Sequence, residues 1–133
     1  MSFLLDTNIC STYLKKPRRL THRFIQHSGR LNVATIILGE LYTWAYRRPD
    51  PSPVLTDISS ELLPQVTELV FDAPCAVEFG RVYPALLNMG RPVEAVDVQI
   101  AATAIVHDLT LVTHNTKDFQ HIAGLRLDDW LAP

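Results

Sequence analysis

The sequence predicts an α/β fold with a parallel sheet covered on both faces by helices, and two features of the pattern indicate it. Short apolar runs such as Phe3–Leu5 and Leu109–Val112 alternate along the chain with segments of helical periodicity. These runs lack the two-residue alternation of a half-exposed strand, and continuous apolar strands are typical of a parallel sheet buried between helices. With 133 residues, 47% of them hydrophobic, the chain can bury about two-thirds of its unfolded surface in one core. We therefore expect residues 1–133 to form a single domain.

Strands and helices are expected in alternation along the chain. The expected strands are Ser2–Leu5, Val33–Ala34, Leu69–Phe71, Leu109–Thr113 and Leu125–Leu127, the last with the weakest pattern. The expected helices follow Asp6, span Arg19–Gln26, follow Thr35 as far as Pro49, span Val54–Leu63, run from Asp72 to Gly90, and span Glu94–His107. The result is a sheet of four or five short strands between helices.

Local signals set the limits of several helices. Thr35 and Asp72 are residue types that cap the first turn of a helix, and Gly90 is placed to end one. Pro84 predicts a kink inside the helix that begins after Asp72. In the helix over 19–26, Ile25 is expected to face the core together with Leu20 and Phe24.

The charge balance and the cysteines narrow the class of protein. A formal net charge of −2 lacks the basic excess of a protein that coats nucleic acid, so any such contact must be local. Cys10 and Cys75 are far apart and form neither a disulfide framework nor a metal-binding pair. Asp6 interrupts the opening apolar run, and no segment approaches the roughly 18 apolar residues of a membrane span. We expect a protein without a membrane segment that works in the reducing cytoplasm.

Asp6 follows the first strand, where an open parallel sheet binds its ligands. An Asp at a strand–helix junction also caps the helix that follows through its carboxylate oxygen. On its own, Asp6 is compatible with either role.

Glu40 and Asp97 lie on helix faces where carboxylates are costly. Glu40 shares a face with Ile37 and Leu41, where burial of an unpaired carboxylate would cost several kcal/mol. Asp97 shares a stripe with Ile100 and its apolar neighbours, and Asp is a poor residue for a helix interior. A structural explanation stays open for each, because a carboxylate at the edge of an apolar stripe can reach water.

A further polar group, Thr113, Asn115 and Asp118, follows the strand with the strongest pattern. These residues could form an ordinary loop, with Asn115 in a turn and Asp118 opening a short helix. Carboxylates that converge at strand ends repel one another, which raises their pKa values, unless a cation joins them. Oxygen ligands without His or Cys at ligand spacing select a hard cation such as Mg²⁺ or Mn²⁺.

In order and spacing these blocks resemble the PIN-domain family as it occurs in VapC-like toxins. The blocks are Leu5-Asp6-Thr7-Asn8, Glu40, Asp97 with Ile100-Ala101-Ala102, and Leu111–Asn115 with Asp118-Phe119. The match covers nearly the whole chain, and the ordered set is more specific than any one motif. Many PIN domains carry a fourth acid near the position of Asn115, whereas the toxin branch often has Asn there.

The resemblance implies a PIN-like α/β/α sandwich and a Mg²⁺- or Mn²⁺-dependent endoribonuclease, the toxin of a type II toxin–antitoxin pair. Its metal ligands would be Asp6, Glu40 and Asp97, with Asn115 and Asp118 as further catalytic residues. The resemblance also implies a cytoplasmic location, an RNA substrate, a homodimer, and a cognate antitoxin protein that occupies the active-site groove.

Residues around the acids have expected supporting roles. Thr7 and Thr113 are placed to orient the metal ligands through their hydroxyl groups. Phosphate contacts are expected from a basic cluster, and charge runs of this kind are also common as solvated faces. The cluster consists of Lys15, Lys16, Arg18 and Arg19, with Arg47 and Arg48 as further candidates.

Two other functions are compatible with parts of the pattern. A Mg²⁺-dependent phosphotransferase of haloacid-dehalogenase or receiver type also places an Asp after its first strand. The dehalogenase pattern requires a second Asp where this chain has Asn8, and neither class explains Glu40 and Asp97. The other alternative is a PIN-like scaffold without catalysis, which binds RNA or a partner and leaves its acids unmetallated.

Overall fold

The five strands of the computed structural model pair in parallel, in the order β3-β2-β1-β4-β5. They are β1 (Phe3–Leu5), β2 (Leu31–Ala34), β3 (Thr67–Leu69), β4 (Thr110–Val112) and β5 (Arg126–Asp128). The structure describes residues 1–91 and 93–133. From the central β1 the chain builds outward to β3 and then returns to form β4 on the other side of β1. This reversal creates a topological switch point at the carboxyl ends of β1 and β4.

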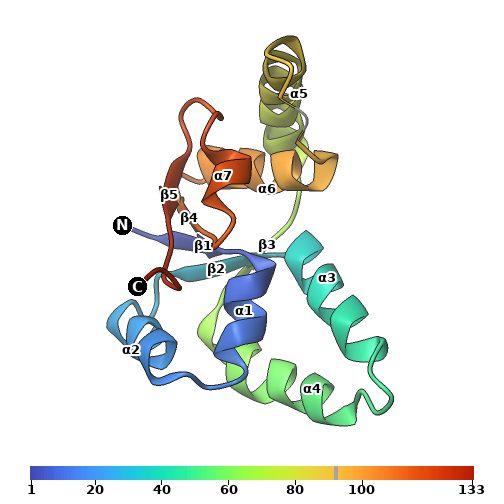
Figure 1. Cartoon of the computed structure of the whole chain (residues 1–133), viewed down its shortest axis with the longest axis vertical. Helices are drawn as coiled ribbons and strands as arrows, with labels where there is room; N and C mark the ends of the chain where they lie inside the picture. The colour runs from blue at the N-terminus through green and yellow to red at the C-terminus, as the bar shows by residue number, and fades with distance from the viewer. Residues whose placement is uncertain (92) are drawn as a thin grey trace.

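Helices cover both faces of the sheet, which confirms the predicted α/β/α class. They are α1 (Thr7–Tyr13), α2 (Arg18–Gln26), α3 (Thr35–Tyr46), α4 (Ser52–Asp57), α5 (Ala73–Asn88), α6 (Ala95–Val106) and α7 (Thr116–Phe119). In Figure 1, α1 to α4 lie below the sheet and α5 to α7 above it. Figure 1 also shows that α5 projects away from the sheet, and its main contacts are with α6. Among the described residues, no helix has both the length and the apolar character needed to cross a membrane.

The two central strands explain why the strand pattern lacks alternation. Leu4 and Leu5 in β1 and Leu111 and Val112 in β4 are fully buried. Each of these strands has a neighbouring strand on both sides and helices over both faces, so every side chain faces apolar surroundings.

The edge strands differ from the prediction. β3 covers Thr67–Leu69 rather than Leu69–Phe71, and β5 covers Arg126–Asp128 rather than Leu125–Leu127. Apolar side chains mark an edge strand poorly, because one of its sides faces water and its residue preferences differ from those of a central strand. Val70 and Phe71 are part of the predicted strand, but they are 60% and 40% exposed and lie in the connection from β3 to α5.

Several helix details also differ. Ile25 is 69% exposed on α2, so the prediction that it faces the core was wrong, whereas Leu20 and Phe24 are buried. Thr35 is the first residue of α3, and Ala34 holds the cap position. The helix predicted from residue 54 to residue 63 is divided into α4, the π-helical turn η1 (Ile58–Leu62) and the 3₁₀ turn η2 (Leu63–Gln65).

Other details agree with the prediction. The Asp72 carboxylate caps α5 by accepting a hydrogen bond from the backbone N–H of Cys75 at 3.2 Å. Gly90 follows the end of α5 with a φ of 66°, in the left-handed region that glycine adopts most readily. Cys10 and Cys75 are both buried and free. Pro84 lies inside α5, as expected, and the helix continues past it; the kink stays a prediction.

An aromatic cluster joins the C-terminal segment to the beginning of the fold. The ring of Trp130, only 1% exposed, lies 5.1 Å from Phe3 and 5.2 Å from His27, measured between ring centroids. Its indole N–H donates to the Asp128 carboxylate at 3.1 Å. The last residues thereby bury β1 and α2, so the C-terminal segment is part of the core.

We expect Trp130→Ala to reduce the free energy of unfolding by about 3–5 kcal/mol, the usual cost of deleting a buried Trp side chain. Urea denaturation followed by circular dichroism measures this change. Ile25→Ala, at a site 69% exposed, is the matched control and should change the value by less than about 0.5 kcal/mol. A Trp130→Ala variant as stable as its parent would show that the cluster does not contribute to the core.

Candidate active site

Asp6 lies at the carboxyl end of β1 and is 7% exposed. One of its carboxylate oxygens accepts from the backbone N–H of Thr7 at 2.8 Å, which caps α1, and the other accepts from the Thr113 hydroxyl at 2.7 Å. The Thr113 hydroxyl in turn accepts from the backbone N–H of Asn115 at 3.0 Å. Asp6 is therefore a helix cap and also a fixed carboxylate at the switch point.

Glu40 approaches Asp6 from α3. Its carboxylate accepts a hydrogen bond from the Thr7 hydroxyl at 2.5 Å. Glu40 is exposed, whereas Ile37 and Leu41 beside it are buried. Of the two possibilities that the sequence left open, Glu40 thus lies at the edge of the apolar stripe of α3, and it also lines the site from there.

Asp97 lies in the first turn of α6 and is partly buried. Burial, followed by the negative charges of Asp6, Glu94, Asp118 and Glu40, raises the pKa of Asp97 from 3.8 to about 6. The influence of these charges means that acids from remote parts of the chain lie near one another.

One pocket of about 310 Å³ collects most of the predicted residues. It is lined by Asp6, Thr7, Asn8, Ser11, Glu40, Trp44, Asp97 and Asn115. Asp118 lies outside it and lines an adjoining pocket of about 380 Å³ with Val93, Glu94 and Asp97. The structure thus brings Asp6, Glu40, Asp97 and Asn115 together in one pocket, while Asp118 shares only the adjoining pocket with Asp97.

The sequence interpretation did not assign site roles to Asn8, Ser11 or Trp44. Helical spacing could have found Ser11 and Trp44, since Ser11 lies four residues after Thr7 and Trp44 four residues after Glu40, each on the same helix face. Asn8 is notable because its side-chain oxygen is buried without a hydrogen-bond partner. Leaving such an acceptor unpaired costs about 1–3 kcal/mol, so it is available to a donor or cation in the pocket.

The chemistry of this pocket fits a hard divalent cation. Its ligand atoms are carboxylate, amide and hydroxyl oxygens, the set that Mg²⁺ and Mn²⁺ prefer. Among the described residues, the oxygens of Asp6, Glu40 and Asp97 do not all lie within 4.8 Å of one another. Carboxylates that face one another repel unless a cation neutralises their charge. In the structure, the carboxylates of Asp6 and Glu40 are instead held in place by hydrogen bonds from the Thr113 and Thr7 hydroxyls.

Asp72, Cys75 and His107 form a second group with metal-ligating atoms, all within 4.8 Å of one another. This group lies where α5 begins and α6 ends, about 15 Å along α6 from Asp97 at 1.5 Å per residue. Burial raises the pKa of the Cys75 thiol, and a protonated thiol is a poor metal ligand. The oxygen-lined pocket therefore fits Mg²⁺ or Mn²⁺ better than this group does.

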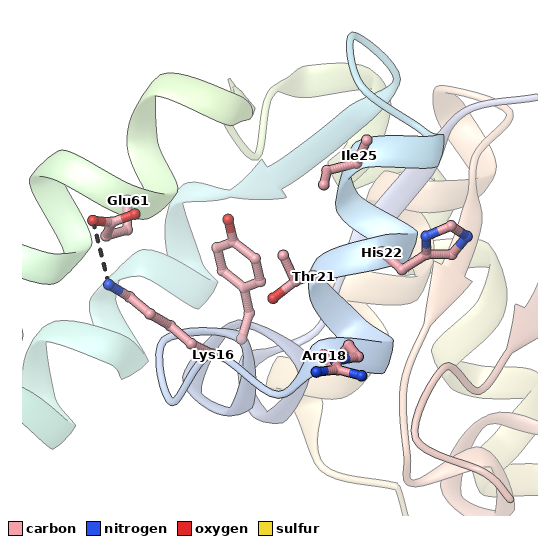
Figure 2. A pocket seen from close by; sticks show the side chains of 7 residues that line it. Lys16, Arg18, Thr21, His22, Ile25 and Glu61 are labelled. Atoms are coloured by element: carbon pink, nitrogen blue, oxygen red, sulfur yellow. Dashed lines mark ion pairs between the residues drawn. The ribbon is translucent and has the colours of Figure 1, made fainter.

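The basic cluster predicted to bind phosphates lies at the other end of α1 from Asp6. Lys16 and Arg18 line a separate pocket of about 480 Å³ (Figure 2), which shares no lining residue with the acidic pocket. The Lys16 ammonium lies 3.7 Å from the Glu61 carboxylate, and Arg19 donates to the backbone carbonyl of Ala132 at 2.6 Å. Lys15 is exposed. The arginines that border the acidic site are instead Arg47 and Arg48, near Glu40.

Residues 3–125 match the family model described as PIN domain, so the chain belongs to the PIN domain family. This membership excludes the haloacid-dehalogenase and receiver classes. Two curated relatives extend the likeness over the whole chain. The tRNA(fMet)-specific endonuclease VapC of Shigella flexneri is 34% identical, with 98% of each chain covered. Ribonuclease VapC2 of Haemophilus influenzae is 30% identical, with 98% of this chain and 99% of the relative covered.

Solved structures show the same fold. The DNA-bound VapBC crystal structure from Salmonella typhimurium contains a chain that superposes with a TM-score of 0.90 at 30% identity, with 98% of each chain covered. A chain of VapBC2 from Rickettsia felis, bound to a promoter DNA fragment, superposes with a TM-score of 0.92 at 26% identity, with 98% of this chain and 99% of that chain covered. The five-stranded parallel sheet with helices on both faces is therefore shared with VapC structures.

The raised pKa of Asp97 predicts that Asp97→Asn stabilises the metal-free protein at neutral pH. The pKa in the folded state, about 6, exceeds the unfolded value of about 3.9, so stability is fully present below about pH 3.9 and falls as pH rises through about 6. The shift corresponds to about 2.9 kcal/mol, which we reduce to about 1 kcal/mol because the carboxylate is only partly buried and water screens its charge.

Thermal denaturation in EDTA should show a melting temperature about 4 °C higher for Asp97→Asn at neutral pH. The difference should disappear below about pH 3, where the Asp97 carboxyl group is protonated in both states. Glu68→Gln, which changes an exposed carboxylate on β3, is the matched control. An Asp97→Asn variant that melts below its parent at neutral pH in EDTA would contradict the prediction.

Proposed function

We propose that this chain is a metal-dependent endoribonuclease and the toxin of a type II toxin–antitoxin pair. The observation that carries the proposal is the convergence of Asp6, Glu40 and Asp97 on one pocket at the switch point of the sheet. The relatives named as VapC ribonucleases support the reaction. We also propose that residues 1–133 act as one domain, and that the enzyme works in the cytoplasm, where cellular RNA is found.

The proposed cation ligands are Asp6, Glu40 and Asp97, and the proposed ion is Mg²⁺ or Mn²⁺. When bound, such an ion lowers the pKa of a coordinated water and stabilises negative charge on the attacked phosphate. Asp6 is suited to its role because two hydrogen bonds fix its carboxylate before any ligand arrives. Asp97, whose pKa is about 6, is largely ionised at neutral pH and can accept a cation without first losing a proton.

Neighbouring polar residues would complete the site. Thr7 and Thr113 orient Glu40 and Asp6 through their hydroxyl groups, which restricts the positions of the ligand oxygens. Asn115, on the rim of the same pocket, and Asp118, beside Asp97, would accept hydrogen bonds from waters around the ion. Asn8 supplies the same kind of acceptor through its unpartnered oxygen.

The proposed protein partner is a cognate antitoxin. Likeness to chains from the VapBC crystal structures of Salmonella typhimurium and Rickettsia felis supports this part of the proposal. An antitoxin that occupies the groove around the acids would prevent cleavage by excluding RNA.

A second copy of the chain is a further proposed partner. The outer face of α5 is apolar or small at each of six exposed positions with helical spacing: Ala73, Ala76, Val77, Gly80, Pro84 and Leu87. A contiguous apolar face on a projecting helix is typical of a protein interface. Self-association through α5 would bury this face against its own copy with two-fold symmetry.

Val77→Glu should convert the dimer to a monomer, because the interface would then bury an unpaired carboxylate. Size-exclusion chromatography with light scattering measures the mass. Ile25→Glu changes an exposed Ile of similar accessibility on α2 and should leave the dimer intact. Monomeric unmodified protein, or dimeric Val77→Glu protein, would contradict this part of the proposal.

The nuclease itself is tested by metal titration and by cleavage of a labelled single-stranded RNA of mixed sequence. Mn²⁺ at about 100 times its dissociation constant should stabilise the fold by about 2.7 kcal/mol. Asp6→Asn and Asp97→Asn should each remove that gain and reduce cleavage by more than the roughly 10- to 100-fold that loss of an outer-shell partner costs. Glu68→Gln is the matched control.

Full metal-dependent cleavage by folded Asp97→Asn protein would show that the ligand assignment is wrong. Metal-dependent stabilisation without any RNA cleavage would instead favour the scaffold that binds RNA or a partner without catalysis. In that outcome the acids would still bind a cation, and the proposed reaction would be withdrawn.

A further inference from the structure

The acidic pocket adjoins a second pocket of different character. This second pocket has a volume of about 560 Å³ and is lined by Thr7, Glu40, Thr43, Trp44, Arg47 and Arg48. Thr7, Glu40 and Trp44 line both pockets. The two pockets therefore meet along α3, with carboxylates at one end and guanidinium groups at the other.

Trp44 follows Glu40 by four residues, which places both on one face of α3. Arg47 is the C-cap of α3, Arg48 follows it, and both line the same pocket as Glu40 and Trp44. At 1.5 Å per residue, Arg47 lies about 10 Å beyond Glu40 along the helix axis. The arginines are thus beside the acids, at a distance suited to a neighbouring phosphate rather than to the one being cleaved.

Arg47 and Arg48 are exposed, and in the described part of the chain neither forms an ion pair with a carboxylate. Other basic residues are engaged, as Arg81 is with Glu78 and Arg126 with Asp108. Two guanidinium groups without acidic partners, next to a cluster of carboxylates, give the pocket a local positive end. Guanidinium groups bind phosphate well because their N–H fork matches its oxygens.

Trp44 adds an aromatic surface to this positive end. Its indole is partly buried against the core, and it contributes to the walls of both pockets. The guanidinium carbon of Arg48 lies 5.5 Å from the centroid of the indole ring. As a purely structural contact, an exposed cation–π pair is worth only about 0.5–1 kcal/mol. An aromatic ring beside unpaired arginines is also the usual composition of a surface that binds single-stranded nucleic acid by stacking and charge.

We propose that Trp44, Arg47 and Arg48 form a binding subsite for the nucleotide next to the cleaved phosphodiester in single-stranded RNA. The two guanidinium groups bind the phosphate of that nucleotide, and the indole ring stacks on its base. An unpaired strand is required, because a base inside a duplex cannot stack on a side chain. This inference rests on the proposed ribonuclease function and extends it to the position of the substrate strand.

The experiment measures RNA binding separately from cleavage. The dissociation constant of a fluorescein-labelled single-stranded RNA of mixed sequence is measured by anisotropy over a range of salt, in an Asp97→Asn background that prevents turnover. Arg47→Gln/Arg48→Gln should weaken binding and reduce the slope of log Kd against log salt by about 0.7, the value for the loss of one phosphate contact. Arg30→Gln/Arg91→Gln removes the same charge elsewhere and should leave the slope near its parent value.

Trp44→Leu should weaken binding roughly 10-fold, the effect of losing one stacked base, without changing the salt slope. The chain contains two tryptophans, and Trp130 is buried, so quenching of tryptophan emission by RNA should be lost in Trp44→Leu. Because Trp44 also packs on the core, the melting temperature of the Trp44→Leu variant is measured to confirm that it is folded. The arginine variants leave the core intact and give an independent test.

Cleavage of the same RNA by the unmodified chain in Mn²⁺ tests the ribonuclease function separately from the subsite. If that chain cleaves RNA while the arginine and Trp44 variants bind with the parent affinity and salt slope, the subsite is wrong and the ribonuclease stands. If the unmodified chain neither binds nor cleaves the RNA, both are wrong. Equal losses in the Arg30→Gln/Arg91→Gln control would also overturn the subsite, since they would reflect overall charge.

Discussion

The site depends on a buried carboxylate at the junction of two central strands. Asp6 donates its backbone N–H to the carbonyl of Val112 at 3.0 Å, while its side chain accepts from Thr7 and Thr113. These bonds connect the end of β1, the start of α1 and the end of β4 at a single residue. The parallel pairing of β1 with β4 therefore determines where the carboxylate lies, and the other acids are positioned around it.

Bringing further acids to this point opposes stability in the metal-free chain. Asp97 stands at the start of α6 and Glu40 on α3, on opposite sides of the sheet edge, so each approaches Asp6 from a separate rigid element. Burial, followed by repulsion from the neighbouring acids, raises the pKa of Asp97, whereas the threonine hydroxyl holds Glu40 in place. Functional sites commonly keep strain of this kind, which the surrounding core must offset. Here the fully buried β1 and β4 supply that support.

Much of this arrangement could be predicted from the sequence, because central parallel strands carry continuous apolar runs and their carboxyl ends carry ligands. Asp6 and Asn115 could be found in that way, and Glu40 and Asp97 as carboxylates on otherwise apolar helix faces. The limits of β3 and β5 could not, since at a sheet edge apolar residues also occur in exposed connections. The basic residues were harder still: Lys16 and Arg47 have similar local patterns, and only the fold determines which of them is near the acids.

The positions of the pocket residues along the sequence also affect when the site can form during synthesis. Its lining runs from Asp6 to Asn115, and Asp6 is not fixed until Thr113 arrives with β4. During synthesis at about 5–20 residues per second, Asp6 would wait roughly 5 to 20 s for that partner. A pocket assembled in this way stays incomplete for most of the chain's translation, because its last lining residue, Asn115, is among the last to be made.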